Sequence, residues 1–185
     1  MKKLFILLAF IFCPTVLAQI QEYKIVDVRD TSISQIRVRG QVWIMSPEAN
    51  TLQDRADTAK QAALDVVALT DAKAVSIFLL PNEKFVGSGY HFATVRHYTD
   101  GCGNSGAPRD CNGKEWEVWA SKVQLTELQL RIAEEIYAPN PPASVLDEFG
   151  LPDEEKLKKY IAKKLKIKVS DVEKNLIYLE PEQIN

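Results

Sequence analysis

Three side chains of the kinds that cooperate in hydrolases, Ser88, His91 and Asp100, occur close together in the chain. In a catalytic triad the serine attacks the substrate, the histidine takes its proton, and the carboxylate orients the histidine. Gly87-Ser88-Gly89 does not match the Gly-x-Ser-x-Gly turn of α/β-hydrolases, because glycine directly precedes the serine and no helix is expected after it. A glycine-permitted bend before a strand is the simpler interpretation. A small hydrolase using the three residues is the alternative hypothesis.

The two histidines, His91 and His97, are placed by the alternating pattern on the same side of one expected strand. Six residues of extended chain separate them by roughly 20 Å, which is too far for one ion to bridge. The sequence also lacks the His-x-x-x-His and Cys-x-x-Cys spacings that are typical of zinc sites. We therefore predict no metal site and no cofactor.

A loop rich in turn formers, residues 100–113, contains four of the chain's eight glycines together with Cys102 and Cys111. The third cysteine, Cys13, falls in an N-terminal segment that is expected to be removed. An even pair in an oxidising compartment predicts a disulfide. A ring of this size would stabilise the fold by about 2.5–3 kcal/mol. Side chains with oxygens suited to calcium, although without EF-hand spacing, are Asp100, Asn104 and Asp110.

A polar face on the second expected strand, Ser34–Met45, is the best candidate for binding. Apolar residues alternate there with polar ones, which is typical of a sheet with one face in the core. The apolar set is Ile36, Val38, Val42 and Ile44. The opposite face carries Arg37, Arg39 and Trp43, and such side chains can bind an anionic or planar partner. A solvated face, or one covered by a terminal segment, is the simpler interpretation.

The N-terminus has the pattern of a secretory signal peptide over residues 1–18. Lys2 and Lys3 precede the apolar run Leu4–Phe12, and the small-residue cleavage signal predicts a cut between Ala18 and Gln19. The apolar run is too short for a transmembrane helix, which needs roughly 20 residues. We therefore expect a periplasmic or secreted protein without a transmembrane segment after cleavage.

The charge of the mature chain is modest. Removing Lys2 and Lys3 lowers the number of basic residues from 23 to 21 against 25 acidic ones, a net charge of about −4. Such a chain offers no electrostatic case for nucleic-acid binding. The lysines of residues 156–168 follow helical amphipathicity and are interpreted as a solvated face.

The elements that must position these side chains are organised around one helix and one strand. Ser46–Leu69 is predicted to be a helix whose inner side is mostly alanine, so that it can sit close to a sheet. Ser46 is the expected cap, and Thr51 is a competing start. Ala74–Leu80 follows as a strand that is apolar on both faces. The inner stripe of the helix is Leu52, Ala56, Ala59, Ala63 and Val66.

We expect an α+β fold with a mainly antiparallel sheet of five or six strands, covered by the alanine-rich helix and with C-terminal helices packed around it. The sheet would be mixed if that helix connects parallel neighbours. Residues 19–137 are the expected core domain, 138–143 a proline-rich linker, and 144–185 a helical extension docked on the core. The other expected strands are residues 23–29, 90–99, 115–121 and 175–180, and further helices cover residues 126–137 and begin at 152.

Most of the mature chain resembles an uncharacterised bacterial family, domain of unknown function 4875. The segments that carry the resemblance are Ser46-Pro47-Glu48-Ala49, the run from Ala56 to Ala63, Ser88-Gly89-Tyr90, Gly103-Asn104-Ser105-Gly106, the run from Gln124 to Leu130, and Leu151-Pro152-Asp153-Glu154-Glu155. The resemblance implies a small α+β domain and carries no catalytic residues. The export signal, the disulfide-closed loop, the exposed aromatic candidates and the lack of a catalytic constellation favour a non-enzymatic binding module whose partner is an envelope or extracellular protein.

Overall fold

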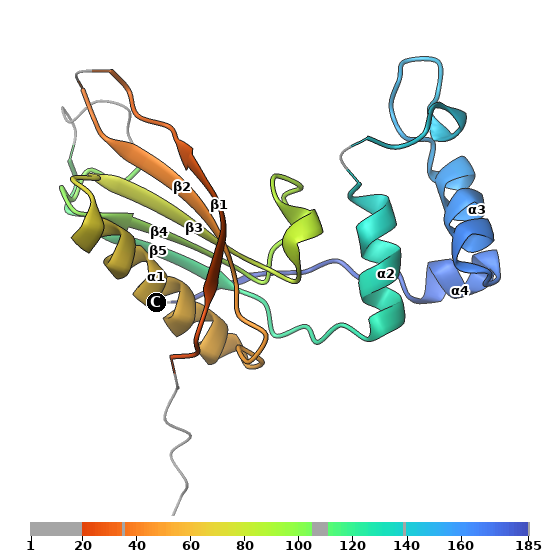
Figure 1. Ribbon diagram of the computed structural model, residues 1–185, viewed down its shortest axis with the longest axis horizontal. Helices are drawn as coiled ribbons and strands as arrows, with labels where there is room; N and C mark the ends of the chain where they lie inside the picture. The colour runs from red at the N-terminus through yellow and green to blue at the C-terminus, as the bar shows by residue number, and fades with distance from the viewer. Residues whose placement is uncertain (1–19, 35, 105–110, 139, 185) are drawn as a thin grey trace, which may run out of the picture.

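The computed structural model describes residues 20–34, 36–104, 111–138 and 140–184. The expected cleavage site between Ala18 and Gln19 lies outside the described residues, as does Pro139 of the expected linker. The chain forms a six-stranded sheet with one long helix beside it and a group of shorter helices beyond one end (Figure 1). Among the described residues, no helix is long and apolar enough to cross a membrane.

The strands of the sheet lie side by side in the order in which they occur in the chain. β2 and β3 are parallel, and all other neighbouring pairs are antiparallel. The predicted α+β class is therefore confirmed, and the sheet is mixed because a helix connects β2 to β3. The strands are β1 (Lys24–Asp30), β2 (Arg39–Met45), β3 (Ala74–Leu80), β4 (Ala93–Tyr98), β5 (Trp116–Ala120) and β6 (Glu182–Gln183).

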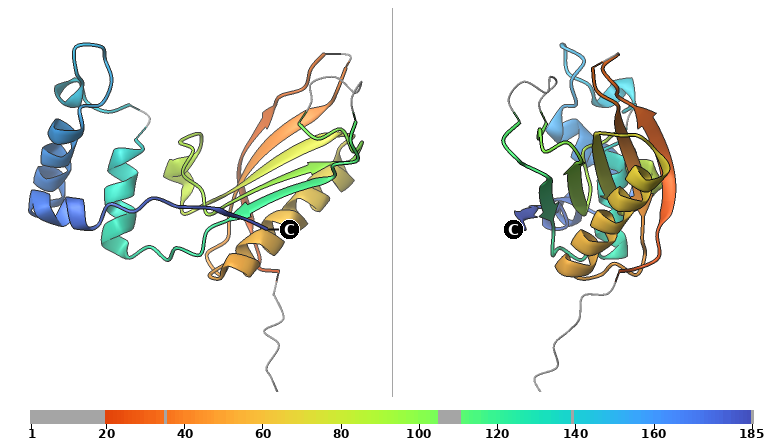
Figure 2. Two further views of the ribbon diagram at one scale, coloured as in Figure 1. Left: turned by 180° about the vertical axis from the view of Figure 1, so that it is seen from behind. Right: turned by 90° about the vertical axis from the view of Figure 1, so that its left-hand side faces the viewer.

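Helix α1 (Leu52–Leu69) lies along one face of the sheet and packs on β3, β4 and β5 (Figure 2). It begins at the competing start: Thr51 caps it, and Asp54 completes a capping box. Ser46 is not the cap, because its hydroxyl donates a hydrogen bond to the Glu22 carbonyl. The alanines of α1 that are 0% exposed, and so let its axis approach the sheet closely, are Ala56, Ala59, Ala62 and Ala63.

The other helices form a second, smaller cluster beyond one end of the sheet (Figure 1). They are α2 (Glu127–Ile136), α3 (Glu154–Leu165) and α4 (Val169–Lys174), with short 3-10 turns at Glu83–Phe85 and Ala143–Val145. Their shared core consists of Ile132, Ile161, Ala162 and Val172. After α4 the chain runs back to the sheet and adds β6 beside β5. The last strand is thus residues 182–183 rather than the expected 175–180.

The alanine surface of α1 makes a direct prediction about stability. Ala59→Leu should lower the free energy of unfolding by about 1–3 kcal/mol, because the added carbons have no space between the helix and the sheet. The matched control is Ala68→Leu on the exposed side of the same helix, which should change stability by less than about 0.5 kcal/mol. Urea unfolding of both variants provides the measurement, and equal effects would contradict the close packing.

Candidate functional site

The face of the sheet opposite α1, here called the open face, has two rows of side chains that run across four strands. The pairing register brings the members of each row side by side. The aromatic row is Trp43, Phe78, Thr94 and Trp119. The polar row next to it is Gln41, Ser76, Arg96 and Glu117. The described helices other than α1 lie beyond the end of the sheet (Figures 1 and 2). At that end the aromatic row is covered, because Trp43 is only 4% exposed and belongs to a buried cluster that includes Ala133 of α2.

Both tryptophans of the aromatic row lie under a guanidinium group. The Arg29 carbon Cζ is 4.5 Å from the centroid of Trp43, and that of Arg96 is 5.4 Å from the centroid of Trp119. Such cation–π contacts keep the charged groups at the surface while the indole rings lie beneath them. The open face therefore presents two partly exposed arginines, with the buried ring of Trp43 under one and the half-buried ring of Trp119 under the other.

Between the two tryptophans, His91 extends the aromatic row. Its ring lies 4.9 Å from that of Phe78, and its Nδ1 is 3.1 Å from the hydroxyl oxygen of Thr94. Burial lowers the pKa of His91 to about 4. The imidazole is therefore neutral near pH 7, where it can exchange hydrogen bonds but adds no positive charge.

A hollow of about 430 Å³ lies where the open face meets the segment that leads to β6. The size is within the range of roughly 300–1,000 Å³ that is common for ligand sites. Tyr90 ties the two sides together, because its hydroxyl donates a hydrogen bond to the Ile177 carbonyl at 3.2 Å. Residues of the hollow include His91, Arg96 and Trp119 on the sheet side and Tyr137 and Tyr178 on the other.

Arg96 is held in place by a carboxylate that several donors share. Its Nη1 lies 3.2 Å from Glu117, which also accepts a hydrogen bond from the Tyr98 hydroxyl at 2.8 Å and pairs with Lys114 at 2.5 Å. Burial by itself would raise the pKa of Glu117, but the hydrogen bonds from Lys114, Tyr98 and Arg96 outweigh it and hold that pKa below its ordinary value. Glu117 therefore remains ionised and fixes the arginine over Trp119.

The residues expected to form the binding face, Arg37, Arg39 and Trp43, are divided between two places. Arg37 is 4% exposed and binds both carboxylate oxygens of Asp100, at 2.9 and 2.7 Å, and the Gly103 carbonyl at 2.9 Å. Arg39 donates to the Asn104 side chain at 3.0 Å. Both arginines thus hold the start of the cysteine loop. Trp43 instead belongs to the aromatic row.

The alternation expected for residues 34–45 applies only to the second half of that segment. Val42 and Ile44 are buried as predicted, whereas Ile36 and Val38 are about half exposed and Arg37 between them is buried. The cause is local: Ile33 and Arg37 form their own bridge, and β2 begins only at Arg39. Because of this tight turn, Ile36 and Val38 point away from the core, whereas a continuous strand would place them on the same face as Val42 and Ile44.

The predicted disulfide between Cys102 and Cys111 is present. Residues 105–110 within its ring, and with them Asp110 of the possible calcium set, lie outside the described residues. Asp100 accepts both its bonds from Arg37 and one from the Cys102 amide, at 3.1 Å. The beginning of the loop is therefore anchored to the chain ahead of β2 by one buried ion pair.

The structure does not bring Ser88, His91 and Asp100 together as a triad. Ser88 donates its hydroxyl proton to the Phe85 carbonyl, and His91 is engaged with Thr94. Asp100 follows the far end of β4, so the length of that strand, roughly 20 Å, separates it from His91. The geometry gives no support to the hydrolase hypothesis.

The two histidines lie on opposite faces of the sheet, contrary to the expected shared side. His91 precedes β4 and turns to the open face, whereas His97 stacks on Trp116 with 3.8 Å between ring centroids. Trp116 packs against the core beneath α1. Within the described part of the chain, His, Cys, Asp and Glu side chains form no group of three or more that could hold a metal ion.

The sequence pattern missed Arg29, Phe78 and His91 as members of one surface. Arg29 and Phe78 belong to β1 and β3, which a whole helix separates in the chain, so only the folded sheet brings both of them to Trp43. A usable signal was present for Arg96, because it alternates with buried Val95 on β4.

The fold and surface together define a small α+β protein with a mixed sheet, one face of which is covered by a helix while the other carries aromatic and arginine side chains. The chain belongs to the family described as Domain of unknown function (DUF4875), whose model matches residues 18–177. It is similar to a crystal structure of a DUF487 family protein from Desulfovibrio piger ATCC 29098, with a TM-score of 0.70 and 25% sequence identity. The likeness covers 91% of this chain and 97% of that one. No curated protein matches the chain.

The neutral state of His91 predicts how stability depends on pH. An unfolded histidine binds a proton near pH 6.5, whereas folded His91 stays neutral down to about pH 4. Acidification across that interval therefore favours the unfolded state, and this contribution is on the order of 2–3 kcal/mol. His91→Gln, which keeps a polar partner for Thr94, should lose less stability than the wild type between pH 6.5 and 4. Denaturant unfolding over a pH series measures this, and parallel curves would contradict a neutral His91.

Proposed function

We propose that this protein is exported and acts as a non-enzymatic binding protein, with a protein of the cell envelope or exterior as its partner. The observation that carries the proposal is the pair of partly exposed guanidinium groups, Arg29 and Arg96, each of which lies over a tryptophan ring of the aromatic row on the open face. Tryptophan and arginine are enriched among the residues that dominate protein–protein binding energy. Export is supported by the leader pattern of residues 1–18 and by the disulfide, which suits an oxidising compartment.

The charges on the open face favour a partner with acidic or planar side chains. Arg29 has a side chain that is 52% exposed, and its one ion-pair partner, Asp27, is itself partly exposed. A carboxylate of a partner could replace water around this guanidinium at little cost, because the charge is already near solvent. Arg39 lies further along the sheet and supplies a second positive group beside the cysteine loop.

Charge reversal at the open face should abolish partner capture. Arg29→Glu removes an exposed cation–π contact, which costs about 0.5–1 kcal/mol, so the protein should stay folded while an acidic partner is repelled. The matched control is Arg131→Glu, an exposed arginine on α2. Each variant is tagged, expressed at native level and gently crosslinked, and the proteins recovered from envelope and medium are quantified by mass spectrometry.

The expected result is a protein that the wild type and Arg131→Glu recover equally and that Arg29→Glu recovers at least tenfold less. Equal recovery by both variants would contradict the open face as the binding surface. A wild-type protein that reproducibly recovers nothing would contradict a protein partner.

Export can be tested by measuring whether the N-terminal leader is removed from the protein. The intact mass of the protein from the envelope or medium should correspond to a chain that begins at Gln19, and Ala18→Arg should leave the leader attached, because the cleavage site needs a small residue. Cys13→Ser serves as the control, since it changes the leader without touching the cut. A full-length protein in the cytosol would contradict export.

A further inference from the structure

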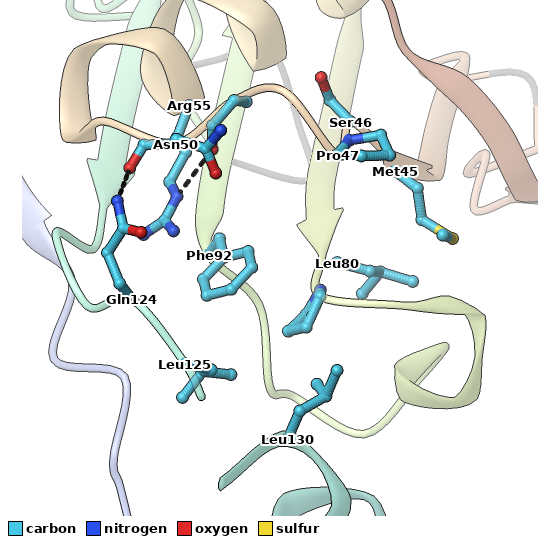
Figure 3. A pocket seen from close by; sticks show the side chains of 12 residues that line it. Met45, Ser46, Pro47, Asn50, Arg55, Leu80, Phe92, Gln124, Leu125 and Leu130 are labelled. Atoms are coloured by element: carbon cyan, nitrogen blue, oxygen red, sulfur yellow. Dashed lines mark hydrogen bonds between the residues drawn. The ribbon is translucent and has the colours of Figure 1, made fainter. Parts of the chain in front are cut away.

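A second cavity, distinct from the open face, lies at the N-terminal end of α1 (Figure 3). It has a volume of about 210 Å³ and is enclosed by the loop between β2 and α1, the loop between β5 and α2, and the first turns of both helices. Its walls combine apolar and polar side chains, and Arg55 is the one charged side chain among the described residues that line it. Prominent wall residues are Leu80, Phe92, Leu125 and Leu130, with the amides of Asn50 and Gln124 at one side.

Arg55 is a buried cation, only 2% exposed. Its Nε donates to the Ala49 carbonyl at 3.0 Å, and its Nη1 donates to the carbonyls of Ser121 and Val123 at 2.5 and 2.7 Å. The guanidinium thereby joins the start of α1 to the chain that leaves β5. One flat side of the group is covered by Phe92, whose ring centroid is 3.8 Å away.

The hydrogen-bond count leaves one edge of this guanidinium unused. A guanidinium has five N–H donors; three are used by the carbonyls, and the two on Nη2 have no acceptor among the described residues. Because Arg55 lines the cavity, these two donors are the ones available to a molecule inside it (Figure 3).

The charge of Arg55 is also uncompensated. Burial lowers its pKa to about 10, and no carboxylate of the described chain contributes to its environment. A pKa of that value still leaves the group positively charged at neutral pH. A buried charge without a counter-ion is costly, because neutral carbonyls replace only part of its lost hydration. An anion that enters the cavity would remove that cost.

We propose that this cavity binds a small monocarboxylate, with one carboxylate oxygen on Nη2 of Arg55 and an apolar body between Leu80, Leu125 and Leu130. A single negative charge matches the single positive one, and no second charged side chain lines the cavity among the described residues. The volume lies below the usual range for drug-sized ligands and so limits the molecule to a short chain or a small ring. This site is independent of the open face and of any protein partner there.

Calorimetric titration with hexanoate and hexanamide tests the proposal on the mature full-length protein. The two molecules have nearly the same shape, and only hexanoate carries the charge. At constant ionic strength, hexanoate should bind at least tenfold more tightly, and it should raise the melting temperature with the logarithm of its concentration once that concentration exceeds Kd. Equal affinities would contradict recognition by Arg55, and a lack of binding by hexanoate would overturn the proposal.

A cavity-filling variant locates the site without disturbing the buried arginine. Leu130→Trp should occupy the space and weaken hexanoate binding at least tenfold, because the new ring takes the place of the apolar body. The matched control is Leu69→Trp, at the exposed end of α1 (84% exposed), which should bind hexanoate as the wild type does. Wild-type affinity in Leu130→Trp would place the hexanoate site elsewhere and overturn the assignment.

Discussion

The close approach of α1 to the sheet is the constraint on which the rest of the molecule depends. Four alanines with no exposed surface form its inner side, so the helix axis can lie near the strands and cover β3, β4 and β5. The connection from β2 to β3 is used for this helix, and for that reason these two strands are parallel while their neighbours are not. Helix α1 covers only one of the two faces of the sheet. The opposite face must be made compatible with water by its own side chains, and the arginines over the tryptophan rings accomplish this.

Two buried arginines link distant parts of the chain, and they differ in how far their positive charge is compensated. Arg37 faces the carboxylate of Asp100 in a two-oxygen arrangement, which compensates its charge and fixes its orientation. Arg55 faces three backbone carbonyls, which satisfy hydrogen bonds without supplying a full negative charge. The first arrangement is electrostatically complete and serves to hold a loop. The second leaves a residual positive potential beside a cavity that is lined by apolar and amide side chains.

The parts of the fold that local sequence determines were predictable, and those that register or burial determines were not. The alanine stripe of α1 and the apolar strand Ala74–Leu80 follow from periodicity, and both are present. Periodicity failed at Arg37, because the bridge between Ile33 and Arg37 interrupts the strand and exposes Ile36 and Val38. The aromatic row depends on the alignment of four strands, which no single segment encodes.

Arg55 went unrecognised for a related reason. It stands directly beside Ala56 and one turn before Ala59, at the border of the buried stripe, where an arginine ordinarily extends its charged end into solvent. The acceptors that hold it inside, the carbonyls of Ser121 and Val123, come from a loop more than sixty residues further along the chain. A position of that kind acquires its environment only from tertiary structure.

The pairing of β6 with β5 has a consequence for the order in which the parts of the structure can form. β6 lies at the end of the chain, yet its partner strand ends at Ala120, and between them are all three helices of the second cluster. Closing such a long loop is entropically unfavourable until other contacts have shortened it. Strands β1 to β5 can pair as soon as they have been synthesised, whereas the wall formed by Tyr178 arrives with the last residues. The hollow joins Tyr90 to Ile177 across 87 residues of chain, so its closure depends on contacts that are far apart in the sequence.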